Sequence, residues 1–340
     1  MPSQQPTCID LDLTSQQGFR KFISSWLYRD AGLTFVVDPG PLATIPHLLA
    51  ELHENGVEHL DYILLTHIHI DHAGGTGALL TAFPEAQVIC HPEGIPHLVA
   101  PEKLWQGTQK VLGPLAAAYG EIVAVPSGRI TFQKVVGNCR VWMTPGHAQH
   151  HLSFQFDDLL FAGEVAGVHY PLESGIFMRP ATPPRFILEV AQKSLDKMIA
   201  LEPQRLVFAH YGLVNEAGKY LRIAREQLDL WVRGVAATAT IAPGEREETI
   251  IAWLRTNDDN YRNVDQLPED ILVRERYFLG NSLRGMIEYV DGARSYKYFL
   301  PARSLLDNSD KTTTAILVGE EEAGEGSEAF TILHRAGLNR

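Results

Sequence analysis

Apolar runs of strand length alternate, over the first two-thirds of the chain, with segments whose apolar residues recur at a helical period. The pattern predicts two strands around a polar turn at 20–40, a helix at 43–55, a strand at 62–66, a helix at 77–83 and a strand at 86–91. This alternation of strands and helices indicates a layered core.

Four predicted strands share a second property, because each leads into a side chain that can bind a metal ion. The strand and ligand pairs are 62–66 with His67, 139–144 with His147, the hairpin 153–163 with Glu164, and 205–209 with His210. Ligands in open α/β folds gather at the carboxyl ends of strands. The repetition therefore predicts one shared site at a sheet edge.

The segment THIHIDHAGG, residues 66–75, holds the densest group of candidate ligands. His67 and His69 are two residues apart, so in an extended segment their imidazoles face the same way and can meet one ion. Asp71 and His72 follow a change in chain direction and can face a second ion. The glycines at 74, 75 and 77 are expected to let the backbone turn tightly beside the site.

The remaining ligands complete two groups. His147 can join His67 and His69, His210 can join Asp71 and His72, and Glu164 can bridge the two ions. The alternative, a solvated polar loop, requires five histidines and two carboxylates to stand at strand ends by accident. Histidines with ordinary surface or core roles are expected at 47, 53, 59, 91, 97 and 334, and supporting roles at 150 and 151.

The part of the chain after His210 has a helical character. Apolar residues spaced 3, 4, 3 and 4 apart from Leu221 to Val235 predict an amphipathic helix, and further helices are expected at 245–256 and 268–290. The domain organisation predicted is a catalytic domain at 1–215, a helical subdomain at 216–291 and a C-terminal extension at 292–340. In that extension, residues 314–319 and 329–334 predict a β-hairpin around an acidic loop.

Composition narrows the class of protein and of partner. The chain has 340 residues, 45% of them hydrophobic, which suffices for a substantial core. A net charge of −12 argues against a nucleic-acid partner, which usually selects a basic face. The three separated cysteines, Cys8, Cys90 and Cys139, predict reduced thiols rather than a disulfide framework.

The N-terminus MPSQQPTCIDLDL lacks the basic start and apolar stretch of a signal peptide, and no apolar run approaches the ~20 residues of a membrane span. We therefore expect a cytoplasmic protein that acts on a small molecule and engages no membrane. The sequence leaves a monomer and a homo-oligomer equally open.

Taken in order, THIHIDHAGG, TPGHAQHHLSF (144–154), GEVAG (163–167) and FAHYG (208–212) resemble the motifs of the metallo-beta-lactamase superfamily over about residues 15–215. The resemblance implies an α+β fold, a four-layer αββα sandwich with a dinuclear metal site, followed here by a helical subdomain placed as in glyoxalase II-type hydrolases. It implies that His67, His69 and His147 hold one metal, and that Asp71, His72 and His210 hold the other. One departure stands out, since the usual bridging residue is aspartate and this chain has Glu164.

The activity implied is that of a metal-dependent hydrolase. Two divalent ions, with zinc expected and iron or manganese as alternatives, would supply a bridging hydroxide, because metal binding lowers the pKa of water from 15.7 to about 7. The hydroxide would attack an ester, thioester or lactone, and Asp71 would act as the catalytic group that orients it and receives its proton. An exported beta-lactamase and a ribonuclease of the superfamily are disfavoured by the N-terminus and the net charge.

Two other classes of function stay open at this point. One is a mononuclear iron oxidoreductase of the sulfur dioxygenase type, and the other is a ligand-binding member of the fold without turnover. Substrate contacts are expected from the segment after Glu164 and from the residue after His210, although a packed connecting loop explains the same segment. These candidates are His169, Tyr170, Phe177, Met178, Arg179 and Tyr211.

Overall fold

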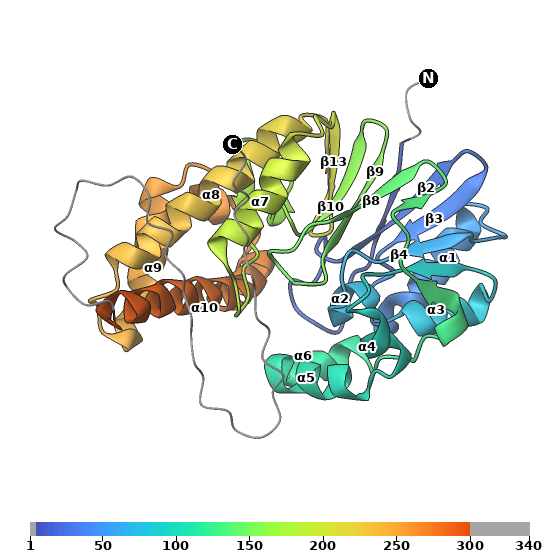
Figure 1. Ribbon diagram of the computed structural model, residues 1–340, viewed down its shortest axis with the longest axis horizontal. Helices are drawn as coiled ribbons and strands as arrows, with labels where there is room; N and C mark the ends of the chain where they lie inside the picture. Colours follow the sequence, from blue (N-terminus) through green and yellow to red (C-terminus); the bar gives the residue numbers. More distant parts are fainter. Residues whose placement is uncertain (1–4, 300–340) are drawn as a thin grey trace, which may run out of the picture. The chain divides into compact units, whose positions relative to one another are not determined.

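The apolar runs assemble into two mixed sheets of six strands each (Figure 1). The computed structural model describes residues 5–299, with side chains described as far as residue 293. The described residues up to Ser295 belong to one compact unit. The hairpin predicted at 314–319 and 329–334 lies outside the described residues.

The first sheet follows chain order. Its strands β1 to β3 are antiparallel, and β3 to β6 are parallel to one another. The bounds are β1 Thr7–Asp10, β2 Ser24–Asp30, β3 Leu33–Val37, β4 Tyr62–Leu64, β5 Gln87–Ile89 and β6 Ile130–Thr131. The parallel strands end at one edge, which is where β4 leads into the histidine-rich segment.

The second sheet has the order β14-β13-β10-β9-β8-β7. Its strands β8, β10 and β13 run in the same direction, because β9 is antiparallel to both β8 and β10 while β13 is parallel to β10. Their carboxyl ends therefore lie at the same edge. The bounds are β7 Val135–Val136, β8 Cys139–Met143, β9 Leu152–Phe156, β10 Leu159–Gly163, β13 Arg205–Phe208 and β14 Leu213–Val214.

Helices cover the outer face of each sheet (Figure 1). Those on the first sheet and in its connections are η1 Leu42–Thr44, α1 Ile45–Glu54, α2 Ile70–Ala73, α3 Thr76–Ala82, α4 Ile95–Val99, α5 Glu102–Leu112, α6 Pro114–Tyr119 and η2 Ser127–Arg129. Those beside the second sheet are α7 Leu188–Ile199, α8 Ala217–Ala237, α9 Pro243–Asn257, η3 Tyr261–Gln266 and α10 Glu269–Phe299. A two-stranded sheet, β11 Val168–Tyr170 with β12 Phe177–Arg179, lies between β10 and α7 in the chain.

Alternation along single strands produces the four layers. On β10, Leu159 and Phe161 belong to the core between the sheets, whereas Leu160 and Ala162 belong to the core under the helices α7 to α10. On β4, Leu64 faces the inter-sheet core and Ile63 faces the helices of the first sheet. Because side chains in a strand alternate between two faces, each sheet packs on a sheet and on helices at once. The predicted αββα sandwich of the α+β class is confirmed.

Several local expectations are refined. The helix predicted at 77–83 is preceded by the separate short helix α2, and the helices α4 to α6, which fill the connection from β5 to β6, had no prediction. The glycines at 74 and 75 have negative φ, so the expected tight turning is not their role. A Cβ would lie 2.5 Å from the Ile70 carbonyl oxygen at Gly74 and 2.4 Å from Ile45 Cδ1 at Gly75, so both are required for close packing.

The helices after β14 bury the apolar face of the amphipathic helix that the sequence predicted. Leu221, Ala224, Leu228, Trp231 and Val235 of α8 are all buried in the core beneath the second sheet. None of the described helices combines the length and the apolar character that crossing a bilayer requires.

A buried ion-pair network fastens α10 to β12. Glu275 of α10 accepts from Arg179 Nε at 2.6 Å and from Arg274 Nη2 at 2.9 Å, and all three side chains are almost fully buried. Burial alone would raise the pKa of Glu275, but the two guanidinium groups outweigh it and lower that pKa. The stability contributed is therefore present above the pKa of an unfolded glutamate and is lost as the pH falls through the lowered folded value.

We expect Glu275→Gln to lower the free energy of unfolding by about 3–5 kcal/mol, because it leaves two buried cations without their carboxylate. Glu248→Gln is the matched control, since Glu248 pairs with Arg276 at the surface and such pairs contribute less than about 1 kcal/mol. Urea unfolding at neutral pH measures both. Equal losses in the two variants would contradict the assigned network.

Candidate metal centre

All seven predicted ligands meet at the edge where the strands end. His67 and His69 lie in the segment that continues β4, and Asp71 and His72 lie on α2. The second sheet supplies the other three, with His147 in the loop after β8, Glu164 directly after β10 and His210 two residues after β13. The two sheets thus contribute to one site from opposite sides.

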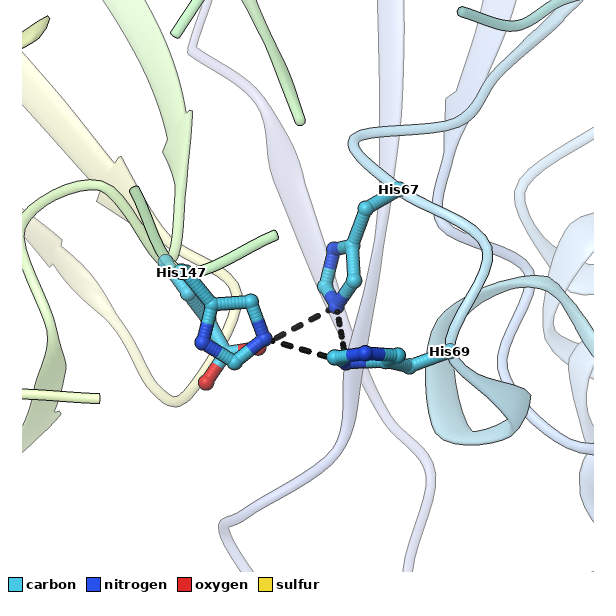
Figure 2. Close-up of side chains that lie close together, drawn as sticks. His67, His69 and His147 are labelled. Atoms are coloured by element: carbon cyan, nitrogen blue, oxygen red, sulfur yellow. Dashed lines mark hydrogen bonds and ion pairs between the residues drawn. The ribbon is translucent and has the colours of Figure 1, made fainter. Parts of the chain in front are cut away.

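The first group consists of His67, His69 and His147. Figure 2 shows His67 and His69 reaching the site from one side and His147 from the other. His69 Nδ1 lies 2.9 Å from His67 Nε2 and 3.0 Å from His147 Nε2. Three ring nitrogens therefore converge on one point, and the spacing of two between His67 and His69 works as the sequence predicted.

The second group consists of Asp71, His72 and His210. His72 Nε2 lies 3.1 Å from His210 Nε2 and 3.6 Å from Asp71 Oδ2, and His210 Nε2 lies 3.5 Å from the same carboxylate oxygen. The Asp71 side chain is 16% exposed, against 1% for His72 and 3% for His210. Asp71 is thus the member of this group that solvent reaches.

Glu164 stands between the two groups. Its Oε2 lies 2.9 Å from His147 Nε2 and 3.3 Å from His67 Nε2 in the first group, and 3.5 Å from His72 Nε2 in the second. Its Oε1 lies 3.8 Å from His210 Nε2. The extra methylene relative to aspartate therefore does not keep the carboxylate away from either group.

The family model of the metallo-beta-lactamase superfamily matches residues 18–210, which span both groups and both sheets. The chain belongs to this superfamily.

Known proteins that are similar to this chain support its assignment to the superfamily. A metallo-beta-lactamase fold-containing protein of Sulfurisphaera tokodaii is 34% identical over 194 residues, covering 54% of this chain and 70% of the relative. A hydroxyacylglutathione hydrolase of Stenotrophomonas maltophilia is 31% identical over 229 residues, covering 67% of this chain and 75% of the relative. The crystal structure of the first of these relatives, the archaeal protein ST1585, superposes with a TM-score of 0.61 at 26% identity, covering 84% of this chain and 100% of that one.

Hydrogen bonds behind the rings determine which nitrogens face the site. Nδ1 of His147 lies 3.1 Å from the Ala181 carbonyl oxygen, and Nδ1 of His210 lies 2.9 Å from the Phe22 carbonyl oxygen. A carbonyl only accepts, so each Nδ1 carries a proton, and in the neutral form of the ring Nε2 is then the nitrogen that presents a lone pair. This is the tautomer that a metal-binding superfamily site requires.

Asp38 organises two further ligands, although it was not among the predicted site residues. Its carboxylate accepts from the Thr66 amide at 2.8 Å and from the Thr66 hydroxyl at 2.6 Å, and it lies 3.2 Å from His72 Nδ1. Because the hydroxyl donates its only proton to Asp38, the Thr66 oxygen is left to accept from His67 Nδ1 at 3.0 Å. Asp38 directly follows β3, so the strand-end rule that found the other ligands also applied to it.

His151 has the supporting role that was expected of it. Its Nε2 accepts from the Glu164 amide at 3.0 Å, and its Nδ1 lies 2.8 Å from the Thr144 hydroxyl. Gly163 is essential here, because φ is +60° and a Cβ would lie 2.4 Å from His151 Nε2. The backbone that carries Glu164 is therefore firmly positioned. His150 also packs here, with its ring 5.9 Å from that of His69.

The electrostatics of the cluster favour a cation. Burial lowers the pKa of His67 well below its ordinary value and that of His69 to about 3, so both are neutral ligands at physiological pH. Burial also disfavours a charge on His72, but Asp71, Asp38 and Glu164 outweigh it and raise its pKa well above the ordinary value. Buried carboxylates require a compensating positive charge. The neutral imidazoles of His67 and His69, together with such carboxylates, belong to a donor set that fits divalent metal ions.

The substrate-contact candidates lie around this centre with different surroundings. Arg179 is buried in the ion pair with Glu275, and Tyr170 belongs to the core under the helices together with Phe177 and Met178. His169 donates from Nδ1 to the Tyr211 carbonyl at 2.6 Å, and its amide donates to the His210 carbonyl at 2.6 Å. His169 thereby supports the backbone of the candidate metal ligand His210. Tyr211, which is partly exposed, turns its hydroxyl to Asp10 and Cys8.

A cavity beside His147 and Glu164 is too small for a substrate. Its volume is about 20 Å³, which is room for a single water molecule. The most exposed of the acidic ligands is Asp71, at 16% against 6% for Glu164.

We expect metal-replete protein to carry close to two metal equivalents per chain, because two ligand groups are fully assembled. Calibrated elemental analysis after removal of loose metal measures this. One equivalent that does not increase on addition of metal would exclude the dinuclear assignment.

Glu164→Gln should weaken metal retention at least about tenfold, because it keeps the shape of the side chain and removes its charge. Glu164→Asp should be milder, since it retains the charge and loses only reach. Chelator competition measures both, with Glu173→Gln, an exposed carboxylate in the following loop, as the control. Wild-type metal affinity in the Gln variant would disprove the role assigned to Glu164.

Proposed function

We propose that this superfamily member is a dinuclear, zinc-dependent hydrolase of a small ester, thioester or lactone. One observation carries the proposal: the Glu164 carboxylate lies within 2.9–3.8 Å of histidines from both ligand groups. A carboxylate shared in this way would serve as a ligand for cations held by either group. Bound divalent ions would lower the pKa of water and polarise a carbonyl oxygen.

Asp71 has the position needed to act on the attacking water. Burial opposes ionisation of Asp71, but His72 and His210 outweigh it and lower its pKa, so the carboxylate is ionised at neutral pH. Its partial exposure puts it on the side that a substrate can reach. An ionised carboxylate there can accept a hydrogen bond from the water, orient it and receive its proton.

The relatives guide the choice of bond. Several of them are hydroxyacylglutathione hydrolases, among them the 31% identical protein of Stenotrophomonas maltophilia. A thioester therefore stands first in the substrate panel, followed by lactones and simple esters. The partial exposure of Asp71 and the net charge of −12 favour small substrates over nucleic acids.

The test is a comparison of metal content and reaction on the same purified protein. Elemental analysis without added metal, followed by a thioester, lactone and ester panel, should show zinc and hydrolysis. A single iron per chain with uptake of oxygen, and no hydrolysis across the panel, would replace the proposal with an iron oxidoreductase. Metal binding with neither reaction would favour a ligand-binding role.

Asp71→Ala should reduce hydrolysis by at least about a hundredfold, because it removes both a ligand and the group that orients the nucleophile. Glu85→Ala is the control, since that carboxylate lies at the surface in a pair with Arg129. Steady-state rates on protein confirmed to be folded by circular dichroism decide the matter. Near-native turnover in the Asp71 variant would refute the catalytic assignment.

A further inference from the structure

A stack of three side chains connects α10 with the second ligand group. The guanidinium carbon of Arg274 lies 4.2 Å from the centre of the Phe22 ring. Another partner of that ring is the imidazole of His210, stacked on it at 4.1 Å with an interplanar angle of 16°. The Phe22 carbonyl also accepts from His210 Nδ1 at 2.9 Å. Phe22 therefore fixes both the plane and the tautomer of a predicted metal ligand.

Arg274 holds the segment that carries Phe22. Its Nη1 donates to the Gly18 carbonyl at 2.8 Å and to the Arg20 carbonyl at 3.0 Å, although these residues are 256 and 254 positions away in sequence. Arg20 in turn pairs with Asp270, one turn earlier on α10, through two bonds of 2.8 and 2.9 Å. The fit is close, because a Cβ on Gly18 would lie 2.1 Å from the Asp270 carbonyl oxygen.

We propose that Arg274 is a positioning residue for His210, acting through residues 18–22, an inference that rests on the proposed metal site. Arg274 touches neither substrate nor metal. By holding this segment, it orders the Phe22 carbonyl, which accepts a hydrogen bond from His210 Nδ1, and the Phe22 ring, on which the imidazole of His210 is stacked. Groups that orient metal-binding histidines typically contribute 10–100-fold to metal affinity. The helical region therefore completes the second ligand group from outside the sandwich.

Arg274→Met tests this with a readout that a general packing role would not produce. The variant keeps an unbranched apolar side chain of similar length, and Glu275 keeps its bond to Arg179. We expect the affinity for one zinc equivalent to fall about 10–100-fold while the other is unchanged, as measured by chelator competition. Cobalt(II) absorption titrations should show the loss of one set of bands and the retention of the other.

Two further variants and a control make the result specific. Phe22→Leu keeps the carbonyl and removes the ring, and Arg274→Lys keeps the cation but loses the planar guanidinium that lies over the Phe22 ring, so each should weaken the same zinc equivalent by a smaller factor. Arg246→Met is the matched control, because Arg246 is another buried arginine of the helical region whose partners are Asp291 and Val235. It should leave both zinc affinities at the wild-type value.

The outcomes separate this inference from the proposed function. Wild-type affinity for both equivalents in folded Arg274→Met, or an equal loss at both, overturns the positioning role. Should that variant not fold, wild-type zinc affinities in Phe22→Leu overturn it instead. A wild-type chain that binds two zinc ions but hydrolyses nothing contradicts the hydrolase proposal, and the affinity comparison stays decisive.

Discussion

Negative charge concentrated in a buried place is the constraint on which the rest of the structure depends. The carboxylates of Asp38, Asp71 and Glu164 gather around histidine imidazoles at one sheet edge with little access to water. Such a cluster is unfavourable unless cations complete it. The seven converging side chains are therefore best understood as one electrostatic unit rather than as separate polar residues.

The sandwich keeps this unit together. Its core between the sheets includes Leu64 of β4 and Phe161 of β10, so the two sheets that deliver opposing ligands cannot separate without exposing that core. The loops beyond the strands are short and are fixed by bonds such as that from the Glu164 amide to His151. Rigid strand ends explain how ligands far apart in sequence hold distances suited to shared ions.

The sequence predicted the individual strands and the ligand cluster from local pattern, whereas the αββα sandwich followed from the resemblance of its ordered motifs to a known superfamily. Period-two alternation marks a strand, and a polar residue after it marks the functional edge, which is how His147 and Glu164 could be found. Contacts such as that of Arg274 with Gly18 join positions 256 residues apart and leave no local trace. Arg179 shows the same limit, because nothing near it in the sequence indicates its buried ion pair with Glu275.

Asp38 makes the two ligand groups dependent on each other. One of its oxygens contacts both His72 and, through the Thr66 hydroxyl, the ring of His67. The negative charge of that oxygen is shared between the two histidines, one from each ligand group, so a stronger hydrogen bond on the side of one weakens the interaction with the other. A change at this one aspartate, which is itself a member of neither group, therefore reaches both halves of the site at once.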